Sequence, residues 1–101
     1  IKMCSQKGAY SLTDPAGMAP QRETMLARTG WDKTPAGKAR RVYLITTDVS
    51  SGPASVVGLA HMARWLHPKA CAGLDPGAWH REYLERFQGR PRHGVYVHPA
   101  D

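Results

Sequence analysis

The sequence predicts an α/β fold in three layers, with a sheet between helices. First, residues 42–47 read as a strand rich in β-branched and aromatic side chains, and its continuous apolar run at 42–45 is typical of a strand buried on both faces in a parallel sheet. Second, Asp14 with Pro15 and Asp75 with Pro76 are pairs that start helices. Third, the expected order of strand, helix, strand, helix, helix, strand favours right-handed crossovers.

The N-terminal part is expected to contain one strand and one helix. Residues 1–4 read as the end of a strand that begins outside the chain, and a polar turn follows. The first helix begins either at the Asp14 cap or only near Pro20, because a proline inside a helix costs about 3 kcal/mol. Gly30 is expected to end this helix region. A connector with a short helical turn should follow at 31–41.

The C-terminal part is expected to contain two helices and a last strand. A helix over 53–66 should bury an apolar face made of Val56, Leu59, Ala60, Ala63 and Leu66. The helix that starts at Asp75 and ends at Gly89 repeats aromatic residues every four positions. We expect these to be core residues and not an aromatic cofactor box: Trp79, Tyr83 and Phe87. Its opposite face offers the pairs Arg81 with Glu85 and Glu82 with Arg86. Residues 94–98 read as a short strand.

The composition limits the classes of function. The chain has 101 residues, enough for one domain with a modest core. Its net charge is +6, but the basic residues are scattered and not interleaved with aromatic ones, which favours a solvated positive surface over a nucleic-acid interface. Cys4 and Cys71 form no CxxC motif, so two free thiols are the default, and a disulfide stays open for an oxidising compartment.

Motifs of metal sites and of nucleophilic catalysis are missing. The five histidines show neither HxxxH nor HExxH spacing, so we expect surface or capping roles for His61, His67, His80, His93 and His98. No serine lies in a GxSxG elbow. We therefore expect no enzyme, no cofactor and no metal held by this chain. A small hydrolase that depends on Asp48, Ser50 or Ser51 is a third, less favoured class.

The segment after the buried strand is the main candidate binding element. Residues 46–51 supply hydroxyls and a carboxylate just beyond the end of the strand, where ligands bind in open α/β sheets. An alternative reading is that Ser50 or Ser51 only caps the next helix, near Gly52 and Pro53. The loop after the first strand should open on the same edge. Its Lys7 and Tyr10 either reach a ligand or are a solvated lysine and a rim tyrosine.

Four sequence motifs then carry a family resemblance: "GWDK", "VYLITTD…SGP", "AxWLHP" and "LDPxxxHREYLERFQG". With them, residues 30–99 resemble the C-terminal end of substrate-binding proteins of ABC importers, of the type that binds iron-siderophore complexes, haem or cobalamin. The resemblance implies a Rossmann-like C-terminal lobe of a bilobal solute-binding protein. Residues 1–101 would be a single, partial lobe, with the N-terminal lobe and the linking helix absent from this chain.

The resemblance also implies a function. Such a protein captures an iron(III) chelate, haem or cobalamin on the periplasmic or extracellular face and delivers it to the ABC permease, and any metal arrives inside the ligand. Membrane anchoring through the missing N-terminus stays open. The ligand-binding residues carried over are Thr47, Asp48, Val49, Ser50 and Ser51, and more loosely Lys7, Gly8 and Tyr10.

Two further expectations complete the sequence analysis. The open cleft face of an isolated lobe should favour self-association, because an exposed apolar patch tends to find a partner. The competing class of function is a stand-alone basic α/β module that binds nucleic acid or an acidic partner.

Overall fold

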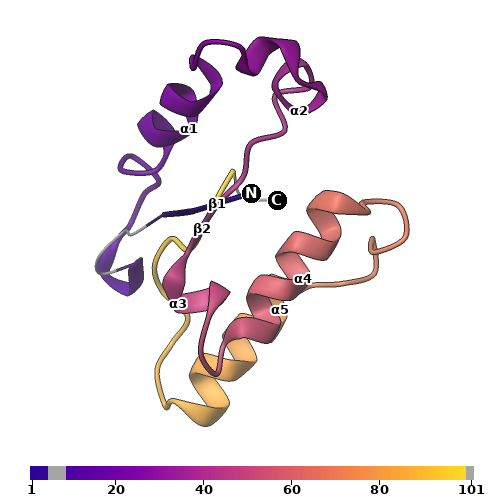
Figure 1. Ribbon diagram of the computed structural model, residues 1–101. Coiled ribbons are helices and arrows are strands. Elements are labelled where there is room, and N and C mark those ends of the chain that lie inside the picture. The colour runs from indigo at the N-terminus through magenta and orange to yellow at the C-terminus, as the bar shows by residue number, and fades with distance from the viewer. Residues whose placement is uncertain (5–8, 100–101) are drawn as a thin grey trace.

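A three-stranded mixed sheet forms the centre of the structure, a computed structural model that describes residues 1–4 and 9–99 (Figure 1). The strands are β1 (Lys2–Cys4), β2 (Leu44–Thr46) and β3 (Val97–His98), and they lie in the order β1-β2-β3. The β1 and β2 strands run parallel, as predicted, whereas β3 is antiparallel to β2. The protein is therefore α/β with a small mixed sheet.

The chain forms only short helical elements between β1 and β2. The 3₁₀ turn η1 (Ala9–Ser11) precedes α1 (Ala19–Leu26), so the later of the two predicted helix starts, near Pro20, is confirmed. The carboxylate of Asp14 instead accepts a hydrogen bond from the Ala16 amide in the preceding turn, at 2.8 Å.

The connector between α1 and β2 contains the expected helical turn. It forms the 3₁₀ turn η2 (Trp31–Lys33) and the short helix α2 (Pro35–Lys38). The hydroxyl of Thr34 caps α2 by accepting a hydrogen bond from the Gly37 amide at 3.0 Å. Gly30 has a φ of 81°, the left-handed region that glycine adopts readily.

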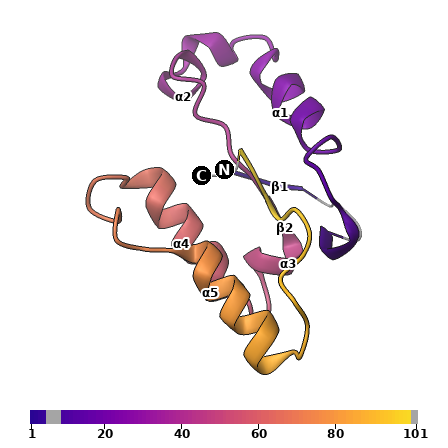
Figure 2. The ribbon, with the colours of Figure 1, turned by 180° about the vertical axis from the view of Figure 1, so that it is seen from behind.

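Helices α3 (Thr47–Ser50), α4 (Ser55–Leu66) and α5 (Pro76–Glu82) follow β2, and α5 continues as the π-helical segment η3 (Tyr83–Phe87). Figures 1 and 2 show α4 and α5 on the side of the sheet opposite to α1 and α2. Among the described residues, no helix combines the length and the apolar character that crossing a membrane requires.

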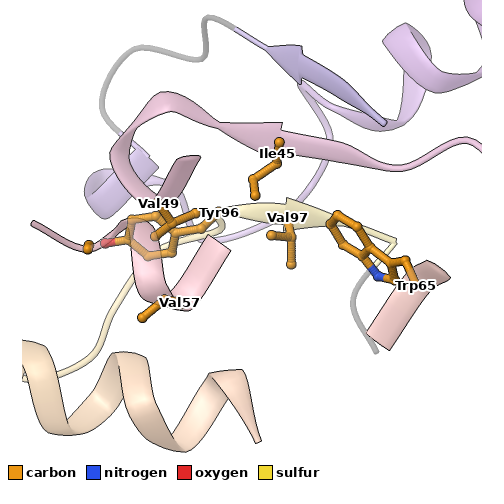
Figure 3. Packing of buried hydrophobic residues seen from close by; sticks show 7 residues of the cluster. Ile45, Val49, Val57, Trp65, Tyr96 and Val97 are labelled. Atoms are coloured by element: carbon orange, nitrogen blue, oxygen red, sulfur yellow. The ribbon is translucent and has the colours of Figure 1, made fainter. Parts of the chain in front are cut away.

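The core lies on both faces of β2, which confirms that this strand is buried on both sides. Leu44 packs with Met18 on one face, and both are completely buried. Successive side chains of a strand point to opposite faces, so Ile45 faces the other way. There it joins the main cluster, which Figure 3 shows: Ile45, Val49, Ala54, Val57, Trp65, Tyr96 and Val97.

The prediction for the buried face of α4 was largely wrong. Val56, Leu59 and Leu66 are exposed, and of the predicted face only Ala60 is buried. The buried residues are instead Val57, Gly58, Ala60, His61 and Trp65. A close approach between the backbones of α3 and α4 explains which face of α4 is buried. A Cβ on Gly58 would lie 1.8 Å from the carbonyl oxygen of Val49 in α3. Only a face with glycine at this position lets α4 pack there.

The prediction for α5 was also wrong for two of its three aromatic residues. Trp79 and Phe87 are exposed, and Tyr83 is partly buried against the core. The inward stripe is Pro76, His80 and Leu84. The Asp75 cap is confirmed by its 2.9 Å hydrogen bond from the Ala78 amide. The ion pair between Glu82 and Arg86 is confirmed at 2.9 Å, whereas the described residues Arg81 and Glu85 form no such pair.

Candidate functional site

One hollow collects side chains from the ends of both parallel strands. Because β1 and β2 are parallel, the segments that follow them leave the sheet at the same edge. Tyr10 in η1 and Asp48 in α3 line a hollow of about 360 Å³ at this edge. The structure thus brings together two of the predicted site residues. The rest of the lining comes from other segments: Pro53, Ala54, His80, Tyr83, Leu84, Gln88, Arg90 and Tyr96.

The predicted binding loop is itself a helical turn, which decides where its side chains point. Val49 is completely buried in the core and anchors the turn, so its side chain cannot line an open cleft. Thr47, Asp48 and Ser51 are exposed, but only Asp48 lines the hollow. The buried hydroxyl of Ser50 has no hydrogen-bond partner among the described residues. Lys7 and Gly8 lie outside the described residues.

The predicted capping role of Ser50 or Ser51 was wrong. Helix α4 begins after Ala54 and has no side-chain cap. The Ser51 hydroxyl donates a hydrogen bond back to the carbonyl oxygen of Thr47 at 2.9 Å, and the Ser51 amide bonds the same oxygen at 3.2 Å. Ser51 therefore closes the preceding turn instead of starting the following helix.

Tyr10 is held against a C-terminal segment far away in the sequence. Its hydroxyl donates to the carbonyl oxygen of Pro91 at 3.2 Å, and its backbone carbonyl contacts Nδ1 of His93. The guanidinium of Arg90 lies 5.7 Å from the centre of the Tyr10 ring, a cation–π arrangement. These contacts place one cation, Arg90, beside the ring of Tyr10 at the hollow.

His80 and Tyr96 supply buried polar groups to the hollow. The pKa of His80 is lowered to about 4, mainly by burial and in addition by Arg92 and His61, whose positive charges oppose a further one on His80. Burial also raises the pKa of Tyr96, with further contributions from Asp48 and Tyr10 that outweigh the opposite effect of Arg92. Both rings are therefore neutral at pH 7.

The hollow is suited to binding a polar, partly aromatic ligand. Asp48 and Arg90 carry its only full charges among the described lining residues. Three phenol rings supply aromatic surface with a polar end: Tyr10, Tyr83 and Tyr96. No serine or cysteine is among the described residues that line it. Its volume is at the lower end of the roughly 300–1,000 Å³ of small-molecule sites.

Two larger hollows contain none of the predicted site residues. One of about 510 Å³ lies beside the stacked rings of Tyr43 and Trp65 and includes Arg41. The other, of about 650 Å³, is lined by His61, Arg92 and neighbouring residues. Among the residues that the structure describes, those from the segments after β1 and β2 line neither of these two hollows, so the smaller hollow is the better candidate. Among the described residues, no three His, Cys, Asp or Glu side chains gather as a metal site, and Cys71 is a free thiol.

The sequence analysis missed Arg90 and Tyr96. Both come from the segment leading to β3, which returns to the sheet antiparallel to β2. A tyrosine inside an expected short strand, such as Tyr96 in residues 94–98, carries no local signal of a site. Comparison with known proteins adds no further residue: no family model matches the chain, and no significant similarity to a curated protein or to a solved structure was found.

Proposed function

We propose that this chain is the Rossmann-like C-terminal lobe of the solute-binding component of an ABC importer. The observation that carries the proposal is the meeting of Tyr10 and Asp48, from the segments after both parallel strands, at one hollow. The sequence motifs described above add the family resemblance. The parent protein would capture an iron(III) chelate, haem or cobalamin at the periplasmic or extracellular face and pass it to the permease.

The size and openness of the hollow support a half-site. At about 360 Å³ it accommodates part of such a ligand, and a second lobe would supply the opposite wall. Phenol rings from Tyr10, Tyr83 and Tyr96 would contact the conjugated parts of the ligand, and Asp48 and Arg90 its polar groups. The mechanism is binding followed by lobe closure, without catalysis and without a metal held by this chain's own residues.

A fluorescence titration of the full-length protein tests the proposal. Ferric siderophores, haem and cobalamin are added in turn while tryptophan emission is followed. We expect saturable quenching by one of the three classes. Asp48→Asn should weaken binding about tenfold or more, because a hydrogen bond to a charged group contributes roughly 1.5–3 kcal/mol. Asp32→Asn is the matched control, since Asp32 is exposed and lies in η2, away from the hollow.

Each result has a defined meaning. Saturation that weakens in Asp48→Asn but not in Asp32→Asn supports the proposal. Saturable quenching that is unchanged in both variants supports the importer function, but it means that the ligand binds elsewhere and not in this hollow. No saturation by any class contradicts the proposal. A basic module would instead bind an oligonucleotide or an acidic peptide, with an affinity that falls steeply as salt rises.

A further inference from the structure

The hollow of about 650 Å³ gathers basic side chains from two segments that are far apart in the sequence. His61 and Arg64 come from α4, and Arg92 comes from the stretch between η3 and β3. Residues three positions apart lie on the same face of a helix, so His61 and Arg64 are neighbours on α4. We call this hollow, with His61, Arg64 and Arg92, the basic hollow.

The acidic groups of the basic hollow do not balance its positive charge. Asp75 is the one acidic residue among the described residues that line it, against the two arginines Arg64 and Arg92. The carboxylate of Asp75 already accepts the 2.9 Å hydrogen bond that caps α5. Arg92 is exposed and forms neither a hydrogen bond nor an ion pair with any described residue. Its guanidinium is therefore available to an anion from outside the chain.

The positive charges of the basic hollow act on a common neighbour. Arg92 and His61 both oppose the protonation of His80 and so help to lower its pKa. Cationic groups that gather in this way repel one another, and a bound anion relieves the repulsion. The positive potential of the basic hollow thus reaches His80, which lines the hollow of Tyr10 and Asp48.

We propose that the basic hollow binds the phosphate group of a small organic molecule. The planar fork of an arginine matches two phosphate oxygens, and its five N–H donors let Arg64 bind a ligand while it keeps contacts within the chain. A phosphate monoester carries a charge of about −1.5 to −2 at pH 7, which two arginines neutralise, whereas a carboxylate carries one charge. The volume of about 650 Å³ lies within the range of small-molecule sites and leaves room for the organic part.

This inference does not depend on the proposed importer function. The basic hollow and the hollow of Tyr10 and Asp48 share none of their described lining residues. The stretch after η3 supplies one arginine to each of them, because Arg90 lines the hollow of Tyr10 and Asp48 and Arg92 lines the basic hollow. These two arginines are two positions apart, so substituting each in turn shows which hollow holds a phosphate.

Isothermal titration calorimetry with phenyl phosphate at pH 7 and constant ionic strength tests the site. We expect saturable binding that Arg92→Gln weakens about tenfold or more, because a charge-assisted hydrogen bond is lost. Arg28→Gln is the matched control, since it removes the same charge from an exposed residue after α1. Benzoate, with the same ring and a single charge, should bind at least about tenfold more weakly than phenyl phosphate. Far-ultraviolet circular dichroism verifies that the variants are folded.

Three results would overturn the inference. The first is a protein that phenyl phosphate does not saturate. The second is equal weakening by Arg92→Gln and Arg28→Gln, or equal affinity for benzoate, because the hollow then selects neither the position nor the charge of the anion. The third is a larger loss in Arg90→Gln than in Arg92→Gln, which would place the phosphate in the hollow of Tyr10 and Asp48.

The titration of His80 gives a second, independent test. Arg92 and His61 help to hold the pKa of His80 at about 4, so an anion bound beside them should raise it. Sulfate is the suitable probe, because it has the shape of phosphate and stays a dianion in this range of pH. Proton NMR of the His80 ring is followed against pH in sulfate and in chloride at equal ionic strength. A rise in sulfate that Arg92→Gln abolishes supports the inference, and a His80 pKa that is the same in both salts contradicts it.

Discussion

The imidazole of His80 meets the ring of Tyr96 edge-on, with ring centres 4.4 Å apart. This contact joins α5 to the segment that leads into β3, and both rings are buried. Because neither ring is ionised at neutral pH, the contact combines aromatic packing with polar groups that remain uncharged. The stability of this junction should therefore depend on pH.

The first prediction is that the free energy of unfolding falls as the pH is lowered from about 6.5 to 4. The pKa of His80 is about 4 in the folded protein, below its ordinary value of 6.5, so the unfolded chain binds more protons in this range. The loss should be at most about 3 kcal/mol by pH 4. Urea unfolding at a series of pH values measures it. The difference from His80→Gln should shrink as the pH falls, whereas exposed His67→Gln should follow the wild-type curve.

The second prediction is that Gly58→Ala destabilises the protein by about 1–3 kcal/mol or more, because the added methyl group would meet backbone. Its Cβ would lie 1.8 Å from the Val49 carbonyl oxygen and 2.8 Å from the carbonyl carbon. Thermal unfolding followed by circular dichroism measures the effect. Gly73→Ala is the control, because no atom lies within 4 Å of a Cβ there. Equal melting temperatures for the two variants would refute the close packing of α3 on α4.

A third prediction concerns the start of α5. Asp75→Ala should lower the free energy of unfolding by about 1 kcal/mol, because the Ala78 amide loses its acceptor. Asp75→Asn keeps a side-chain oxygen at the same place and should restore most of the loss. Denaturant unfolding of the three proteins under one condition makes the comparison. If Asp75→Asn is as unstable as Asp75→Ala, the charge of Asp75 and not its hydrogen bond is what matters.

The fourth prediction is that Met18→Ala costs about 2–5 kcal/mol, the usual range for removing a large buried aliphatic side chain. Met18 is completely buried and forms the contact between the turn before α1 and Leu44 in β2. Met3→Ala removes a similar volume from an exposed position and should change stability by less than about 0.5 kcal/mol. A difference smaller than this between the two variants would show that the α1 side of the sheet contributes little to the core.

Local signals predicted the elements better than they predicted the buried faces. The Asp75 cap, the late helix start near Pro20 and the burial of β2 depend on residues close in sequence, and all three are found. Helix α4 instead has apolar residues on two sides, so the spacing of these residues does not predict which side is buried. The choice depends on Gly58 meeting Val49 of α3, a contact that becomes visible only in the folded chain.

The candidate site likewise contains some residues that the sequence could predict and others that it could not. Tyr10 and Asp48 could be predicted because residues after parallel strands meet at one edge of a sheet. Ser50 and Ser51 were assigned to a ligand wall or a cap because the turn that contains them was read as an open loop. Arg90 and Tyr96 could not be predicted, since they reach the hollow through the antiparallel return of β3.

The pairing of β2 has a consequence for how the protein forms during synthesis. Ile45 of the central strand β2 pairs with Met3 on one side and with Val97 on the other. Both edges of β2 are therefore paired only when β1 and β3 are both available. A nascent chain that has emerged only as far as η3 still has an open strand edge, which other chains can join. Such long-range pairing also slows folding. Protection from aggregation on the ribosome is therefore most important just before residues 97–98 emerge.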